Sequence, residues 1–171
     1  MINIVLYEPL IPQNTGNIMR TCVGINAKLH LIEPLGFSLD EKHLKRSALD
    51  YINHLNYEVY PNFEAFQTKN KGTYYFLSRY GKKPYHEIIF NKDEDVYLIF
   101  GKETTGIDRP LLAKHMDHTF RIPTTDKIRS LNLSNAVSIV AYEYLRQTGF
   151  EGLSSREPDT LKGEDYLDTF L

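Results

Sequence analysis

Short apolar segments alternate with amphipathic segments along most of this chain, and this alternation limits the folds available to it. The apolar segments are rich in β-branched and aromatic residues and are bounded by Pro, Gly or Asn, which is typical of strands. The segments between them have helical spacing. The pattern favours the α/β class, with a mostly parallel sheet covered by helices on both faces. The expected strands are Ile2–Tyr7, Lys28–Glu33, Tyr57–Tyr60, Thr73–Ser78, Val96–Phe100 and Thr119–Ile122, and the expected helices are Gly16–Asn26, Asp40–Leu49, Phe63–Lys69, Pro110–His115 and Asn132–Gln147.

The last of these helices is the clearest, because its apolar residues form one unbroken stripe at helical spacing. Gly149 follows it and supplies a stop. Asn135, Ser138 and Tyr142 fall on the side opposite the stripe. The stripe consists of Leu133, Ala136, Val137, Val140, Ala141, Tyr144 and Leu145.

The chain is organised as one domain followed by an acidic tail. Its 171 residues are the usual length of a single domain, which we assign to residues 1–150. Residues 151–171 contain six acidic and two basic residues, so a chain of net charge −2 has a body of charge +2. A mildly basic body is compatible with RNA binding through local clusters. We expect the tail to dock loosely or to lack order.

Composition also bears on the cellular location of the protein and on membrane and metal partners. Cys22 is the only cysteine, so no internal disulfide forms, which fits the cytoplasm. Its apolar helix face, shared with Ile18 and Met19, predicts a core position. We find no signal peptide and no apolar segment near the roughly 20 residues that span a bilayer, so no membrane partner is expected. His115 and His118 lack a third clustered ligand, so no metal site is predicted either.

Two common nucleotide-binding patterns are missing from the sequence. The segment from Gly101 to Gly106 follows a strand, as a phosphate-binding loop does. That loop needs Lys and then Ser or Thr after its second glycine, whereas Ile107 and Asp108 stand here. The glycine pattern of dinucleotide-binding folds does not occur anywhere in the chain.

Polar segments follow three of the expected strands, at the edge where open α/β sheets bind ligands. The first runs from Pro12 to Arg20. In it Asn14 can cap a helix, Gly16 permits a close backbone approach, and Asn17 shares a helix face with Arg20. Taken alone, it is equally well explained as a capped helix with an exposed arginine.

The other two segments are a glycine-rich turn and a long polar loop. In the turn, Phe100 to Gly106, two glycines surround Glu103, an arrangement that offers backbone amides and one charge to a ligand. Alone, an ordinary strand-to-helix turn is the better interpretation. The loop, Ile122 to Ala136, leads into the last helix and holds more capping groups than one helix needs. These groups are Ser130, Asn132, Ser134 and Asn135.

Together the three segments resemble the signature motifs of the SPOUT class of RNA ribose methyltransferases, and most closely its TrmL (YibK-like) group. They have the order N-x-G-N-I-x-R, F-G-x-E-x-x-G and I-P…S-L-N-L-S-N-A-V-S, and the similarity runs from Met1 to about Gly149. The resemblance implies a SPOUT fold with a C-terminal trefoil knot and a homodimer. It also implies S-adenosylmethionine-dependent 2′-O-methylation of the wobble ribose, at cytidine or modified uridine 34, in the anticodon loop of tRNA.

The resemblance also assigns residues to the site. Arg20, Tyr142, Asn14 and Asn132 would be catalytic. An arginine stays protonated in proteins, so we expect Arg20 to hold a phosphate and stabilise alkoxide charge rather than accept a proton. The cofactor pocket would contain Leu77, Gly101, Glu103, Ile122, Ser130 and Leu131, and no metal is needed.

Basic residues outside these motifs are candidate phosphate contacts, although charge alone favours an ordinary solvated surface. They are Lys42, Lys45, Arg46 and Arg129. Two other functions stay open: a related 2′-O-methyltransferase with another RNA target, and a non-catalytic module that binds RNA or a nucleotide.

Overall fold

The computed structural model describes residues 1–40 and 49–171. The helix expected over 40–49, and with it Lys42, Lys45 and Arg46, lies almost entirely outside the described residues. Leu49–His54 forms a short 3-10 helix, η1. No helix in the described part of the chain is both long and apolar enough to cross a membrane.

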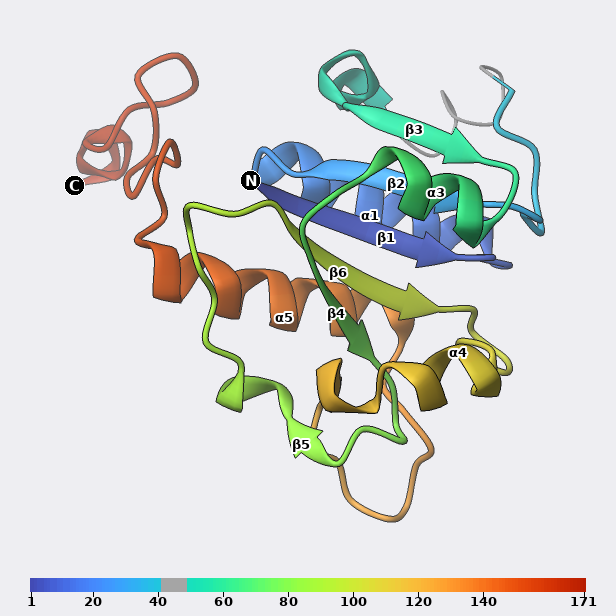
Figure 1. Cartoon of the computed structure of the whole chain (residues 1–171). Helices are drawn as coiled ribbons and strands as arrows, with labels where there is room; N and C mark the ends of the chain where they lie inside the picture. Colours follow the sequence, from blue (N-terminus) through green and yellow to red (C-terminus); the bar gives the residue numbers. More distant parts are fainter. Residues whose placement is uncertain (41–48) are drawn as a thin grey trace.

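A parallel sheet forms the centre of the molecule (Figure 1). Its seven described strands have the order β3-β2-β1-β6-β4-β7-β5, and each neighbouring pair is parallel. Six strands were predicted to within two residues. The seventh, β5, has two residues and therefore no periodicity to detect. The strands are β1 (Ile2–Tyr7), β2 (Lys28–Ile32), β3 (Tyr57–Tyr60), β4 (Thr73–Leu77), β5 (Lys83–Pro84), β6 (Val96–Gly101) and β7 (Thr119–Arg121).

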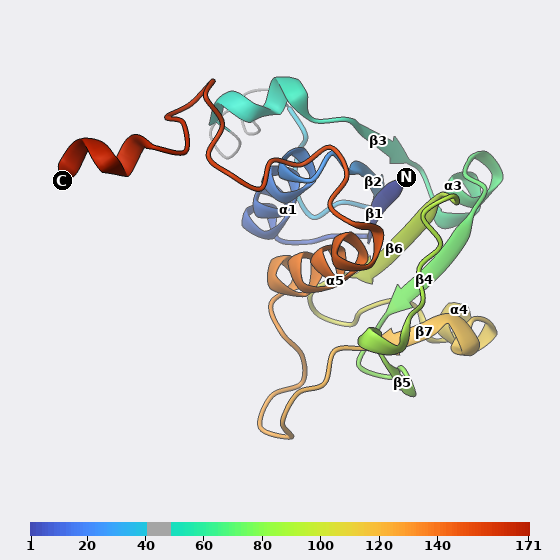
Figure 2. The same cartoon turned by 90° about the vertical axis from the view of Figure 1, so that its left-hand side faces the viewer.

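Helices cover both faces of the sheet, as predicted (Figure 2). Along β1, Ile4 and Leu6 pack into one apolar core, whereas Val5 and Tyr7 pack into the other. This alternation follows from the two-residue repeat of a strand. One face carries α1 (Pro12–Gly24) and α5 (Leu133–Thr148), and the other carries α3 (Phe63–Lys69) and α4 (Arg109–Lys114).

Helix α1 begins earlier than the sequence suggested. It starts at Pro12 rather than Gly16, because proline already has the backbone angle of a first helical turn. Asn14 therefore lies inside the helix, and its expected role as the cap is wrong. Cys22 is completely buried on this helix, as predicted, and burial raises the pKa of its thiol to about 12.

Helix α5 confirms the predicted stripe. Asn132 caps it, since its side-chain oxygen accepts a hydrogen bond from the Ser134 amide at 2.9 Å. The helix ends at Gly149, which has the left-handed backbone that favours glycine (φ 89°). Tyr142 lies on the outer side, 51% exposed. The buried residues are Val137, Val140, Ala141, Tyr144 and Leu145.

The acidic tail leaves the end of α5 and runs away from the sheet (Figures 1 and 2). It consists of turns and one short 3-10 helix, η4 (Tyr166–Phe170). Leu153 packs against the core, whereas Leu167 and Phe170 are 73% and 70% exposed. The domain boundary at residue 150 stays a prediction.

Candidate active site

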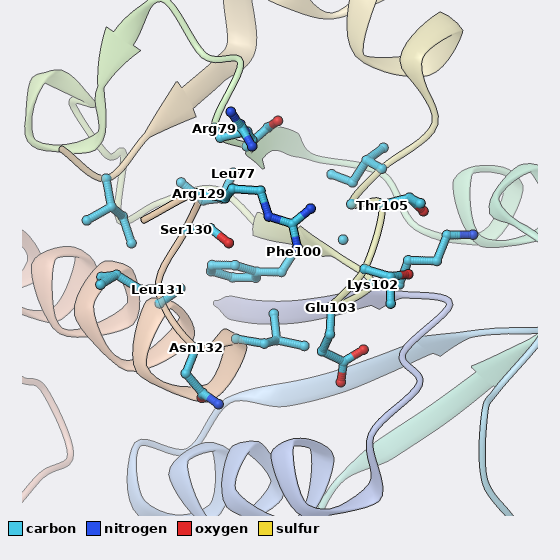
Figure 3. A pocket seen from close by; sticks show the side chains of 18 of the residues that line it. Leu77, Arg79, Phe100, Lys102, Glu103, Thr105, Arg129, Ser130, Leu131 and Asn132 are labelled. Carbon is cyan, nitrogen blue, oxygen red and sulfur yellow. The ribbon is translucent and has the colours of Figure 1, made fainter. Parts of the chain in front are cut away.

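A cavity of about 520 Å³ opens at the carboxyl ends of β4, β6 and β7 (Figure 3). This is the edge at which ligands bind in open α/β sheets. All six residues expected to contact a cofactor line it, although they come from three separate parts of the sequence. They are Leu77, Gly101, Glu103, Ile122, Ser130 and Leu131.

The glycine-rich turn forms one wall of the cavity and folds back on itself. Lys102 and Gly106 pair across it, and the Gly106 amide donates to the Lys102 carbonyl at 2.9 Å. A Cβ atom added to Gly101 would lie 2.3 Å from the Gly106 carbonyl carbon, closer than any real side chain allows. Glycine is therefore required at 101 for the turn to close beside the cavity.

Glu103 shows that this turn also holds the start of α1. Its carboxylate accepts hydrogen bonds from the Leu10 amide at 2.8 Å, the Ile11 amide at 3.0 Å and the Asn14 side-chain amide at 3.2 Å. The first amides of a helix lack internal partners and attract negative charge, so this arrangement stabilises α1. The charge that the sequence seemed to offer to a ligand is directed at the protein itself.

An amide bridge joins α1 to the start of α5. The Asn132 side-chain nitrogen donates to the Asn14 oxygen at 3.0 Å, so Asn14 contacts both Glu103 and Asn132. Asn14 is 6% exposed, although it carries a polar side chain. These two asparagines thus fix the two helices and the turn relative to one another, beside the cavity.

A second hollow of about 460 Å³ lies between α1 and α5, one helical turn beyond the amide bridge. Arg20 and Tyr142, the other two candidate catalytic residues, both line it. The Arg20 guanidinium lies 5.8 Å from the centre of the Tyr51 ring. The other residues that line this α1–α5 hollow are small or polar: Asn17, Thr21, Gly24, Ser134, Asn135 and Ser138.

The four candidate catalytic residues therefore form two adjoining pairs rather than one cluster. Asn14 and Asn132 line the cavity, while Arg20 and Tyr142 line the α1–α5 hollow. Each pair takes one residue from α1 and one from α5 or its cap. The α1–α5 contact thus connects a pocket suited to a small molecule with a charged, open surface.

Arg129 is the one predicted RNA contact among the described residues, and it also lines the cavity. The sequence analysis missed its cationic neighbours, which follow β4, lie in the glycine-rich turn, begin α4 or end β7. Among the described residues, no group of three or more His, Cys, Asp or Glu side chains is placed to hold a metal ion. The missed residues are Arg79, Lys102, Arg109 and Arg121.

Comparison with known proteins identifies the family. The model of the SpoU rRNA Methylase family matches residues 1–142 of this chain. The chain belongs to the SpoU rRNA methylase family. This match covers both hollows and excludes the acidic tail.

Individual SpoU relatives are similar over nearly their whole length. A tRNA (cytidine(34)-2'-O)-methyltransferase of Saccharophagus degradans is 45% identical over 154 residues, which cover 89% of this chain and 99% of that protein. A solved structure from Bacillus anthracis is 46% identical, with a TM-score of 0.88, and the match covers 90% of this chain and 98% of that one. A structure solved to study 2-OH methylation of C/U34 on tRNA is 40% identical, with a TM-score of 0.79, over 86% of this chain and 96% of that chain.

Proposed function

We propose that this SpoU-family protein transfers a methyl group from S-adenosylmethionine to the ribose 2′-hydroxyl of nucleotide 34 in tRNA. One observation carries the proposal: the cavity gathers all six expected cofactor residues and adjoins the hollow that holds Arg20 and Tyr142. The activity named for the 45% identical relative supports the choice of substrate.

The cavity fits the cofactor in size and chemistry. Its volume of about 520 Å³ lies within the range of small-molecule sites. The side chains of Leu77, Ile122 and Leu131 offer apolar surface to an adenine, and the turn at Gly101 brings peptide groups to its edge. Glu103 contributes to this wall mainly through its backbone, because its carboxylate is held by α1. When bound, the cofactor supplies a methyl group activated by a sulfonium.

Arg20 supplies positive charge where the RNA must react. A ribose hydroxyl gains negative charge as it attacks the methyl group and loses its proton. A guanidinium stays charged and can hold both a phosphate and the developing alkoxide. We therefore assign Arg20 to electrostatic stabilisation, and Asn14 and Asn132 to positioning of α1 and α5 at the reaction site.

A homodimer and a trefoil knot belong to the same proposal. The α1–α5 hollow is bordered by small polar residues and the exposed Tyr142, so a second copy can approach it closely and complete the site. The knot is supported by the path of residues 122–132, which lead from β7, next to the edge strand β5, back to α5 beside α1. Location in the cytoplasm stays a prediction from the single cysteine.

Nucleoside mass spectrometry of tRNA from a strain lacking the gene tests the proposed substrate. We expect loss of the 2′-O-methylated nucleoside at position 34, and its return when the gene is restored. Loss at another position would instead support a related enzyme with a different RNA target. Calorimetry with S-adenosylmethionine completes the test, because absence of binding with or without tRNA would favour a non-catalytic binding module.

A further inference from the structure

Three arginines line the 520 Å³ cavity; Arg79 and Arg129 are exposed and Arg121 is half-buried. Arg79 follows β4, Arg121 ends β7, and Arg129 lies in the loop before α5. Figure 3 places Arg79 on the opposite side of the cavity from Asn132, with the Arg129 side chain extending over the opening. We call these three residues the arginine rim.

Carboxylates in the described part of the chain leave the charge of the arginine rim uncompensated. Within residues 1–40 and 49–171, none of its members forms an ion pair with a carboxylate. Glu103 is the one carboxylate among the described residues that line the cavity, and it is bound to the start of α1. Asp126 lies in the same loop as Arg129 but is exposed and forms no ion pair with it. A partly enclosed surface with uncompensated positive charge attracts anions strongly.

Neighbouring side chains hold part of the rim in place. Tyr80 is 45% exposed, and its ring centre lies 5.4 Å from the Arg79 guanidinium and 4.5 Å from that of Arg109. Arg109 donates to the Tyr80 hydroxyl at 3.2 Å and to the Thr105 carbonyl at 2.6 Å. Stacking on an aromatic ring restricts a guanidinium but leaves its N–H groups able to bind another group.

We propose that the arginine rim binds phosphodiester groups of the RNA strand that carries the target nucleotide. The inference rests on the proposed function, because it adds to the RNA contacts of the same site. A guanidinium matches two phosphate oxygens with parallel hydrogen bonds, and such contacts fix the register of a nucleic acid. The strand then runs from the Arg20 side of the α1–α5 hollow, across the cavity mouth, to the loops after β4 and β7. Backbone contacts of this kind position the RNA without reading its sequence.

The test measures binding of a fluorescent anticodon stem-loop RNA to the Arg79→Gln/Arg121→Gln variant over a series of salt concentrations. Each lost phosphate contact should weaken binding by about tenfold and reduce the slope of log affinity against log salt by about 0.7. Affinity for S-adenosylmethionine, measured by calorimetry, should stay unchanged. The Arg79→Lys/Arg121→Lys variant keeps the charges and should restore most of the slope.

Lys92→Gln is the matched control, because it removes one exposed charge at the opposite edge of the sheet, before β6 begins. It should bind RNA as the unaltered protein does. Unchanged affinity and slope in the double glutamine variant would refute the arginine rim as an RNA site. If that variant loses affinity for S-adenosylmethionine but keeps the normal salt dependence of RNA binding, the proposal is also refuted. The arginines would then belong to the cofactor site. If the unaltered protein methylates no tRNA while the slopes still differ, the proposed reaction fails and the rim stands.

Discussion

The cavity at the strand ends and the α1–α5 hollow adjoin, yet they are built in different ways. Backbone turns and internally bonded polar groups form much of the cavity, as Gly101 and Glu103 illustrate. The hollow is formed by side chains on two finished helices, and Arg20 and Tyr142 are both exposed there. Substitutions that open the backbone turn of the cavity should therefore disturb folding together with ligand binding. Substitutions in the hollow should change the reaction and leave the fold intact.

Arg20→Ala tests this contrast most strongly. We expect methyl transfer to fall by a factor on the order of 100 to 1,000, because one charged group that stabilises the reaction is lost. Melting temperature and affinity for S-adenosylmethionine should stay close to normal, since the side chain is exposed on α1. Single-turnover methylation and calorimetry measure the two effects. Arg146→Ala, an exposed change on α5, serves as the control, and a large loss of cofactor affinity in Arg20→Ala would move Arg20 into the cofactor site.

Unlike Arg20→Ala, a substitution at Gly101 should reduce stability and cofactor binding. The added methyl group of Gly101→Ala would meet the backbone of Gly106 and Ile107 at 2.3–2.4 Å, so the turn must open. We expect the free energy of unfolding to fall by about 2–3 kcal/mol. Cofactor binding should be lost as well. Denaturant titration and calorimetry provide the measurements. Gly24→Ala is the control, because its added Cβ would meet no atom within 4 Å beyond its chain neighbours and the backbone of its own helix. Normal stability and cofactor binding in Gly101→Ala would contradict the close-packed turn.

Acid should lower the free energy of unfolding of the whole domain through His30, and so affect the cavity and the α1–α5 hollow together. This side chain is completely buried on the α3 side of the sheet, between the Tyr60 hydroxyl and the Asn3 oxygen, each 3.0 Å away. Burial lowers its pKa from 6.5 to about 4. The unfolded chain therefore binds the proton first, and stability should fall by up to about 3 kcal/mol as pH drops from about 6.5 to 4.

Denaturant titrations across this pH range measure the His30 effect. The His30→Gln variant removes the titrating group and should show a flatter pH dependence, even if its stability at neutral pH is lower. An equally steep decline in that variant would assign the acid sensitivity to other groups.

Glu103→Gln should have the smallest effect and would sharpen the role of the carboxylate. The variant keeps one acceptor oxygen but removes the charge at the start of α1. We expect a loss of about 1 kcal/mol in stability, measured by denaturant titration, with cofactor affinity nearly retained. Glu64→Gln, in the exposed first turn of α3, is the control and should cost only a few tenths of a kcal/mol. A large loss of cofactor affinity without a loss of stability would show that the charge acts on the ligand instead.

Local patterns determined most of the secondary structure and named the segments of the site. Strand alternation and the stripe on α5 are visible in a few neighbouring residues, which is why six strands and α5 were placed within two residues. The start of α1 was misplaced although Pro12 is a local signal; the carboxylate that also supports this start belongs to Glu103, about 90 residues away in the sequence. The short strand β5 was missed because a two-residue strand carries no pattern.

The sequence by itself determined the α/β class, the apolar faces and the motifs that place this chain among ribose methyltransferases. Tertiary structure decided which of those residues meet. It paired Asn14 with Asn132, 118 positions apart, turned Glu103 toward α1 rather than a ligand, and gathered the arginine rim from three separate segments. The physical reason is that periodicity and capping act over a few residues. Charge compensation and long-range hydrogen bonds depend on distances in space, which only the folded chain sets.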